Sequence, residues 1–125
     1  MNALLLDTDV IIDILRNKEK TIEQISSLIP GKMLCCSCIS VGEIFAGMHK
    51  KEEVLTRQLL DSLIKIPVTE EIAERAGRLK YTIKSHALQL DDCLIGATAL
   101  ANNLMLLTKN SKHYPFANLA VQKII

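Results

Sequence analysis

The chain has 125 residues, of which 49% are hydrophobic but only 3% aromatic, and its formal net charge is +1. This length predicts one domain, residues 1–125, whose core must be built from Leu, Ile, Val and Ala. The near-neutral charge argues against a protein that binds nucleic acid through its overall charge. No stretch reaches the roughly 18 apolar residues of a membrane span.

The N-terminal half alternates buried strands with amphipathic helices. Residues 4–6, all leucine, predict a short buried strand that ends at Asp7. Asp7-Thr8-Asp9 predicts the start of a helix, because short polar side chains cap helix N-termini. The other elements expected in this half are a helix that ends before Pro30, a strand at 33–39 and a helix that begins at Ser40.

The C-terminal half is organised around residues 88–110, LQLDDCLIGATALANNLMLLTKN. Two adjacent acids open an almost wholly apolar run, which predicts a buried helix. Asn102 and Asn103 can adopt the left-handed conformation that stops a helix, and 104–107 then predicts a strand buried on both faces. The other elements expected here are a helix at 52–63, a strand at 64–68, a helix at 69–85 and an edge strand at 119–121.

Strands that alternate with helices, without a tight hairpin signal, favour an α/β fold with helices on both faces of a parallel sheet. In such a sheet, ligands bind outside the carboxyl ends of the strands, where the strand order reverses. If the strand at 4–6 is central, Asp7, Glu43 and the loop 108–110 share that edge. The helix that begins at Asp92 can bring its N-terminus to the same place.

Each of these acids also has a purely structural explanation. Asp7 and Asp9 are typical helix caps. Ser40 and Glu43 fit the capping box S-x-x-E, and the acids at 91–92 complement a helix dipole. In combination, however, like charges in one crevice repel each other unless a cation compensates them. Oxygen ligands without His or Cys favour Mg²⁺ or Mn²⁺, and such an ion suits phosphodiester hydrolysis.

Four blocks of the sequence, LLLDTDVIID, SVGEIFAG, LDDCLIGATAL and LLTKNSKHYPF, resemble in order the motif blocks of PIN-domain ribonucleases. The resemblance covers nearly the whole chain and is strongest to the toxin of VapBC-type toxin–antitoxin pairs. By position, Asp7, Glu43 and Asp92 match the three acids of the family. Asp92 is preferred to Asp91 because DCLIGATA aligns with the family pattern. Asn110 falls where many members carry a fourth acid.

The resemblance implies a PIN-like three-layer sandwich of helices around a short parallel sheet, and cleavage of RNA that depends on Mg²⁺ or Mn²⁺. Asp7, Glu43 and Asp92 are the implied metal ligands, and Asn110 is a further catalytic residue. Asn110 is uncharged where many family members carry an acid. The number of metal ions bound, one or two, therefore remains open. The implied partners are a cognate antitoxin, whose segment would fill an apolar groove on the first two helices and the helix carrying Phe45, and a second copy in a homodimer.

Basic and aromatic side chains offer contacts for the substrate. The candidates beside the acids are Thr108, Lys109, Lys112 and His113. A second set lies on the predicted helix 69–85, although a solvated charged face explains it equally: Arg75, Arg78, Lys80 and Lys84. The stretch from His113 to Phe116 could stack a base, or Phe116 simply closes the core.

Two other classes of function fit part of the pattern. A phosphoacceptor receiver domain needs an acid at the end of its third strand, where this chain has Ile66-Pro67-Val68. A catalytically inactive PIN-like module that binds RNA or protein remains the main alternative, although all three main acids are present. No base-reading motif is visible, so the sequence leaves tRNA, rRNA and mRNA open as targets.

The cysteines and the N-terminal residues indicate the cellular compartment of the protein. Four cysteines, Cys35, Cys36, Cys38 and Cys93, are expected to be buried reduced thiols that act as small hydrophobes. The redox-like spacing of Cys35 and Cys38 falls inside an apparent strand rather than at a helix start. No charged-then-apolar leader precedes a cleavage site, and with no apolar span this predicts a cytoplasmic protein without a membrane partner.

Overall fold

The computed structural model describes residues 2–85 and 88–125 and contains a five-stranded sheet. Its strands are β1 (Ala3–Leu6), β2 (Met33–Ser37), β3 (Ile64–Ile66), β4 (Met105–Thr108) and β5 (Val121–Lys123). They lie in the order β3-β2-β1-β4-β5, and each neighbouring pair is parallel. Strand β1 is central, which meets the condition for Asp7 and Glu43 to share one edge of the sheet, and the strand order reverses there.

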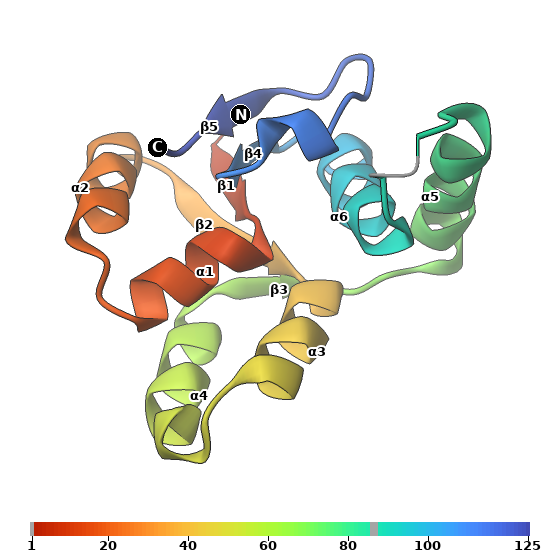
Figure 1. The fold of residues 1–125 in the computed structure, drawn as a ribbon. Coiled ribbons are helices and arrows are strands. Elements are labelled where there is room, and N and C mark those ends of the chain that lie inside the picture. Colours follow the sequence, from red (N-terminus) through yellow and green to blue (C-terminus); the bar gives the residue numbers. More distant parts are fainter. Residues whose placement is uncertain (1, 86–87) are drawn as a thin grey trace.

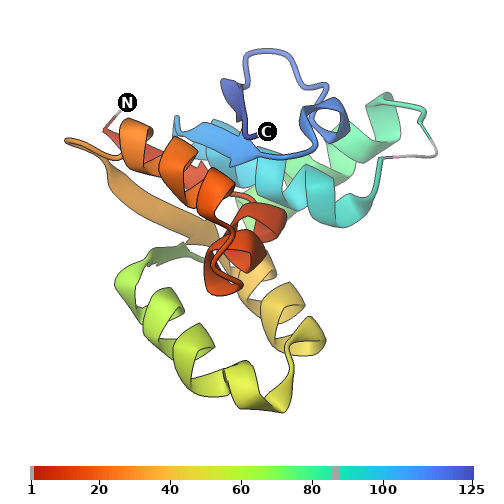
Figure 2. The same cartoon turned by 60° about the vertical axis from the view of Figure 1, so that its left-hand side comes forward.

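Helices cover both faces of the sheet, which confirms the three-layer α/β fold (Figure 1). The helices are α1 (Thr8–Leu15), α2 (Glu19–Leu28), α3 (Cys38–Gly47), α4 (Glu53–Ser62), α5 (Glu70–Thr82) and α6 (Leu90–Ala101), with short 3-10 helices η1 (Lys50–Glu52) and η2 (Ser111–His113). Helices α5 and α6 lie on one face, and α1 and α2 on the other. The pair α3 and α4 extends away from the sheet (Figure 2).

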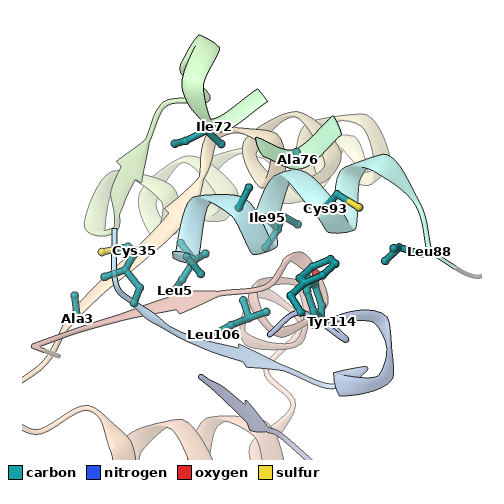
Figure 3. Close-up of a cluster of buried hydrophobic side chains, with 14 residues drawn as sticks. Ala3, Leu5, Cys35, Ile72, Ala76, Leu88, Cys93, Ile95, Leu106 and Tyr114 are labelled. Carbon is teal, nitrogen blue, oxygen red and sulfur yellow. The ribbon is translucent and has the colours of Figure 1, made fainter. Parts of the chain in front are cut away.

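Alternating side chains of β1 feed two apolar cores, because successive residues of a strand point to opposite faces. Leu5 packs with Ile95 of α6 and Ala76 of α5 in the first core (Figure 3). Leu6 packs with Ile11 of α1 in the second, which also includes residues of α2, α3 and α4. With apolar side chains on both faces, β1 is completely buried, as predicted for a central parallel strand.

Helix α6 lies between the sheet and α5, and half of its residues are fully buried. Its small side chains permit this: a Cβ atom added at Gly96 would lie only 2.4 Å from the ring of Phe116. Its two end residues, Leu90 and Ala101, are exposed. After the helix, Asn103 has a φ angle of 52°, which confirms the predicted left-handed stop.

The start of α3 differs from the prediction. Ser37, not Ser40, is the N-cap, and its side chain accepts a hydrogen bond from the N–H of Ile39 at 3.2 Å. Strand β2 ends early because its pairing with β3 ends at Ser37 and Ile66. The predicted capping box of Ser40 and Glu43 is therefore wrong, and both side chains are available for other contacts.

Two further expectations need correction. Cys38 is exposed at the first residue of α3, whereas the other three cysteines are buried; all four are free thiols. Strand β5 begins at Val121 rather than 119, because Leu106 pairs with Val121 and Thr108 with Lys123. Among residues 2–85 and 88–125, no helix has the length and apolar character needed to cross a membrane.

Candidate active site

Asp7 is fixed at the carboxyl end of the central strand. Its backbone N–H donates to the carbonyl of Leu107 in β4 at 2.9 Å. Its Oδ1 accepts a 2.8 Å hydrogen bond from the N–H of Thr8, so Asp7 is also the N-cap of α1. Its Oδ2 accepts a 2.6 Å hydrogen bond from the hydroxyl of Thr108, which is fully buried. The sheet and two side-chain contacts therefore hold this carboxylate in place.

Glu43 reaches the same edge of the sheet from the second turn of α3. The Thr8 hydroxyl donates to its Oε1 at 2.6 Å and also lies 2.8 Å from the Oγ of Ser40. Burial, followed by a hydrogen bond with Asp91, raises the pKa of Glu43 to about 7. At neutral pH this carboxyl is therefore present in both its protonated and its ionised form.

The two adjacent acids at the start of α6 make different contacts. Asp92 Oδ2 accepts a 3.2 Å hydrogen bond from the N–H of Gln89 in a capping box and lies 4.0 Å from Nδ1 of His113. Burial raises the pKa of Asp92, and the Gln89 N–H partly offsets this effect. Asp91 contacts Glu43 instead. Since both acids face the same site, the preference for Asp92 stays a prediction.

Asp9 and Asn110 lie on the β4 side of the site. Asn110 Nδ2 donates to Asp9 Oδ2 at 2.9 Å, and the Asn110 N–H donates to the hydroxyl of Thr108 at 3.0 Å. Asp9 Oδ1 is buried and has no hydrogen-bond partner among the residues that the structure describes. Burial, followed by the charge of Asp7, raises the pKa of Asp9 to about 6. A buried carboxylate oxygen without a partner favours a bound cation or water.

These side chains border one crevice of about 230 Å³ at the carboxyl end of the sheet. Its acidic lining consists of Asp7, Asp9, Glu43, Asp91 and Asp92, and the amide of Asn110 and the ring of His113 also face it. The structure thus brings the four predicted catalytic residues together, as expected for the edge where the strand order reverses. We call this site the acidic crevice.

The donor atoms of the acidic crevice suit a hard cation, since nearly all are carboxylate or amide oxygens. Within residues 2–85 and 88–125, no three His, Cys, Asp or Glu side chains already stand in a metal-binding arrangement. The carboxylates are instead held by protein donors, such as the Thr8 hydroxyl and the Gln89 N–H. The oxygens outside these bonds, including the unpartnered Oδ1 of Asp9, are those that fit an ion.

The candidate substrate contacts have separate positions. The Thr108 hydroxyl is buried behind Asp7, and His113 borders the acidic crevice. Lys109 turns away from the crevice: its Nζ lies 2.8 Å from Oδ2 of Asp13 on α1. Lys112 borders a neighbouring pocket. Of the four candidates, only His113 lines the crevice itself.

The other proposed RNA contacts lie elsewhere. Arg75 and Arg78 border a groove between α5 and the loop after η2, and Lys80 Nζ donates to the carbonyl of Leu88 at 2.7 Å. None of the basic residues of α5 lines the acidic crevice as it is formed by the described residues. Tyr114 and Phe116 are both buried and pack edge to face, so the core explanation for Phe116 is confirmed.

Sequence reasoning missed several residues that shape this site. Thr8 joins α1 to α3 through Glu43, and its place between Asp7 and Asp9 was the available signal. Asp13 holds Lys109, and it lies four residues after Asp9, hence on the same side of α1. Tyr114 was considered only for base stacking, yet its hydroxyl is buried close to Asp7. No local pattern distinguished that hydroxyl.

The fold and the sequence both have known counterparts. A family model described as the PIN domain matches residues 4–121. Ribonuclease VapC10 of Mycobacterium tuberculosis is 35% identical over 114 residues, which cover 90% of this chain and 86% of that protein. The chain therefore belongs to the PIN-domain family and, within it, to the VapC-type ribonucleases.

Solved structures agree with this assignment. A chain of a toxin–antitoxin complex from Klebsiella pneumoniae matches with a TM-score of 0.83 and 28% identity, covering 98% of both chains. A chain of VapBC-1 from nontypeable Haemophilus influenzae matches with a TM-score of 0.78 and 26% identity, covering 97% of both chains. The match to nearly full-length chains shows that the whole fold is shared.

Proposed function

We propose that the protein is an endoribonuclease that depends on Mg²⁺ or Mn²⁺ and is the toxin of a type II toxin–antitoxin pair. The observation that carries this proposal is the convergence of Asp7, Glu43 and Asp92 in one crevice at the carboxyl edge of the sheet. Its relatives include proteins named as ribonucleases.

The residues of the acidic crevice have distinct roles in this proposal. Asp7, Glu43 and Asp92 would hold the metal ion, which when bound would activate a water molecule and compensate the charge of the phosphodiester. Asn110 holds Asp9 through its Nδ2 and lines the crevice beside it. Thr108 and Thr8 orient Asp7 and Glu43 through short hydrogen bonds. His113, beside Asp92, is the side chain placed to meet the RNA backbone.

The test of this proposal is cleavage of a mixed single-stranded RNA pool with Mg²⁺, with Mn²⁺ and with EDTA. Asp7→Asn and Glu43→Gln should each lower the rate by orders of magnitude, because each removes a charge from the metal site. Glu23→Gln, an exposed change on α2 of the same chemistry, is the matched control. Cleavage that persists in EDTA would exclude metal dependence. RNA binding without cleavage would favour the inactive PIN-like module.

A second comparison decides between the adjacent acids of α6. Asp92→Asn should lower cleavage as strongly as Asp7→Asn, whereas Asp91→Asn should have a much smaller effect. Thermal unfolding of both variants in EDTA separates catalysis from capping, since Asp92 also accepts a hydrogen bond from the Gln89 N–H. If Asp91→Asn abolishes cleavage and Asp92→Asn changes only stability, the two assignments must be exchanged.

The surface around α1, α3 and α4 suits the proposed antitoxin segment. A narrow apolar depression lies between α1, α3 and α4, lined by Ile12, Leu15, Ile44 and Met48 among others. Val54 and Leu55 on α4 are largely exposed. An Arg of the partner that entered the acidic crevice would pair with its carboxylates and compete with metal. Co-expression with the product of the neighbouring gene should suppress RNA cleavage; full activity in the complex would reject this partner.

Homodimer formation is part of the same proposal. The expectation rests on the resemblance to VapBC toxins. Light scattering of the purified chain over a range of concentrations should give twice the 13.9 kDa mass of the monomer. A constant monomer mass would reject the homodimer without affecting the proposed chemistry.

A further inference from the structure

A basic pocket lies next to the acidic crevice. Its lining residues are Lys109, Asn110, Ser111, Lys112 and Lys123, and its volume is about 180 Å³. Asn110 borders both the crevice and the pocket, so the two sites adjoin at this residue. The molecule as a whole is nearly neutral, which makes three lysines around one concave site a local concentration of charge.

Strand pairing fixes the distance between the two sites. Thr108, which donates to Asp7 Oδ2, is the register partner of Lys123 on β5. Hydrogen bonds run from the Asp7 N–H to the Leu107 carbonyl and from the Ile124 N–H to the Thr108 carbonyl. Asp7 and Lys123 therefore stand at the ends of strands two positions apart, roughly 10 Å at the usual strand spacing. Both lie at the carboxyl edge of the sheet.

Two of the three lysines have no carboxylate partner within residues 2–85 and 88–125. Lys109 is paired with Asp13 at 2.8 Å, but Lys112 and Lys123 form no ion pair in these ranges, and both are exposed. The hydroxyl of Ser111 supplies a further polar group. Exposed ammonium groups around a concave polar site favour a phosphate, which lysine binds as a point charge.

We propose that this basic pocket binds a second, uncleaved phosphate of the same RNA strand whose scissile phosphate occupies the acidic crevice. This inference rests on the proposed ribonuclease function and adds a direction: the strand crosses the carboxyl edge of the sheet from β1 over Asn110 towards β5. Lys112 and Lys123 hold the phosphate, and Lys109 forms the wall through its bond to Asp13. Since only phosphate is contacted, this pocket positions RNA without reading its sequence.

The test measures binding of a short single-stranded RNA of mixed sequence in EDTA, where cleavage is absent, and cleavage kinetics with Mn²⁺. Lys123→Gln and Lys112→Gln should each weaken binding several-fold and lower the slope of log K against log salt by about 0.7. With Mn²⁺, they should raise KM more than they lower kcat. Lys123→Arg should restore binding. Lys20→Gln, a matched charge removal on α2, should leave both the affinity and the slope unchanged.

A neutral linkage in the RNA locates the phosphate directly. Replacing one internal phosphate by a methylphosphonate, one position at a time, should reveal a position that weakens binding to the wild type but not to Lys123→Gln. If Lys123→Gln and Lys112→Gln behave as Lys20→Gln while RNA is still cleaved, the pocket assignment is wrong and the ribonuclease proposal stands. If binding depends on Lys123 but no cleavage occurs with any metal, the ribonuclease proposal fails and the phosphate pocket remains.

Discussion

Asp13 is a carboxylate that the fold buries and then compensates. Its Oδ2 accepts hydrogen bonds from the Thr21 hydroxyl at 2.7 Å and from Lys109 Nζ at 2.8 Å. Burial acts to raise the pKa of Asp13, but the bonds from Lys109 and Thr21 outweigh it and lower the pKa below its ordinary value. The ion pair thus ties α1 to the loop after β4, which carries Asn110, and the hydrogen bond from Thr21 ties α2 to α1.

We expect Lys109→Met to destabilise the protein by about 1–2 kcal/mol at neutral pH, between the values for exposed and buried ion pairs. The loss is limited because the Lys109 side chain is 39% exposed. Since the folded-state pKa of Asp13 is lowered, the contribution is present above the unfolded pKa and disappears as pH falls through the folded one. Urea unfolding at neutral and acidic pH measures this difference.

The control for that experiment is Lys112→Met, which removes the same charge from the neighbouring pocket. Lys112 makes no ion pair with residues in the ranges 2–85 and 88–125. The free energy of unfolding of the Lys112→Met variant should therefore be close to that of the wild type. Equal effects of the two changes would mean that Asp13 does not depend on Lys109. A double-mutant cycle with Asp13→Asn would then isolate the pair itself.

At the scale of helices and strands, periodicity and capping residues predicted most of the fold. The leucine strand and its terminal Asp7 followed from the sequence because a buried strand and a helix cap are both local patterns. The start of α3 did not, because Ser37 and Ser40 are equally suitable caps and only the end of pairing with β3 selects Ser37. The position of Lys123 likewise depends on strand register, which local sequence does not encode.

The candidate site was predictable to the same extent. The order of the strands brought Asp7, Glu43 and Asp92 to one edge, because parallel strands end together. The partners that hold them were not predictable, since the Thr8–Glu43 contact joins residues 35 positions apart and Thr108–Asp7 joins residues 101 apart. Such contacts depend on packing between elements rather than on spacing within one.

The contact of α6 with the loop after η2 gives an element-scale prediction. In Gly96→Ala, the new Cβ would meet Phe116, whose ring is buried against Tyr114. Overpacking costs typically 1–3 kcal/mol, which exceeds the gain of about 1 kcal/mol from replacing glycine in a helix. We therefore expect a lower urea midpoint for unfolding and slower RNA cleavage, because the displaced loop directly follows η2, which carries His113.

Gly77→Ala in α5 is the matched control for Gly96→Ala. A Cβ atom at Gly77 would meet no neighbouring atom within 4 Å. The helix propensity term then acts alone, and the urea midpoint should rise, with no change in cleavage. If both changes stabilise the protein equally, the ring of Phe116 moves freely and the packing of α6 is looser than the structure indicates.

At the scale of the whole molecule, a nearly neutral chain separates its charges at one edge of the sheet. Carboxylates surround the end of β1, and lysines surround the ends of β4 and β5. Burial and neighbouring carboxyls raise the pKa of Glu43 from 4.5 to about 7, and burial and Asp7 raise that of Asp9 from 3.8 to about 6. In the metal-free protein, these carboxyls therefore lower the free energy of unfolding by an amount that depends on pH.

The sign of that dependence follows from proton binding. Between pH 4.5 and about 7, the folded state keeps a proton on Glu43 that the unfolded chain has lost. The free energy of unfolding contributed by this group therefore falls as pH rises through that range and stays low above it. Asp9 acts in the same direction between 3.8 and about 6. A cation that binds only the folded state should offset this loss in free energy of unfolding at neutral and higher pH.

We predict that in EDTA the wild-type protein melts at a higher temperature at mildly acidic pH than at pH 8, and that Glu43→Gln reduces this difference by raising the melting temperature at pH 8. Mn²⁺ should stabilise the wild type at pH 8, by about 2.7 kcal/mol at a hundred times Kd, and Glu43→Gln much less. Glu23→Gln should behave as the wild type throughout. A wild type indifferent to Mn²⁺, with a Glu43→Gln variant that melts lower in EDTA, would mean that Glu43 serves only to join α3 to α1 through Thr8.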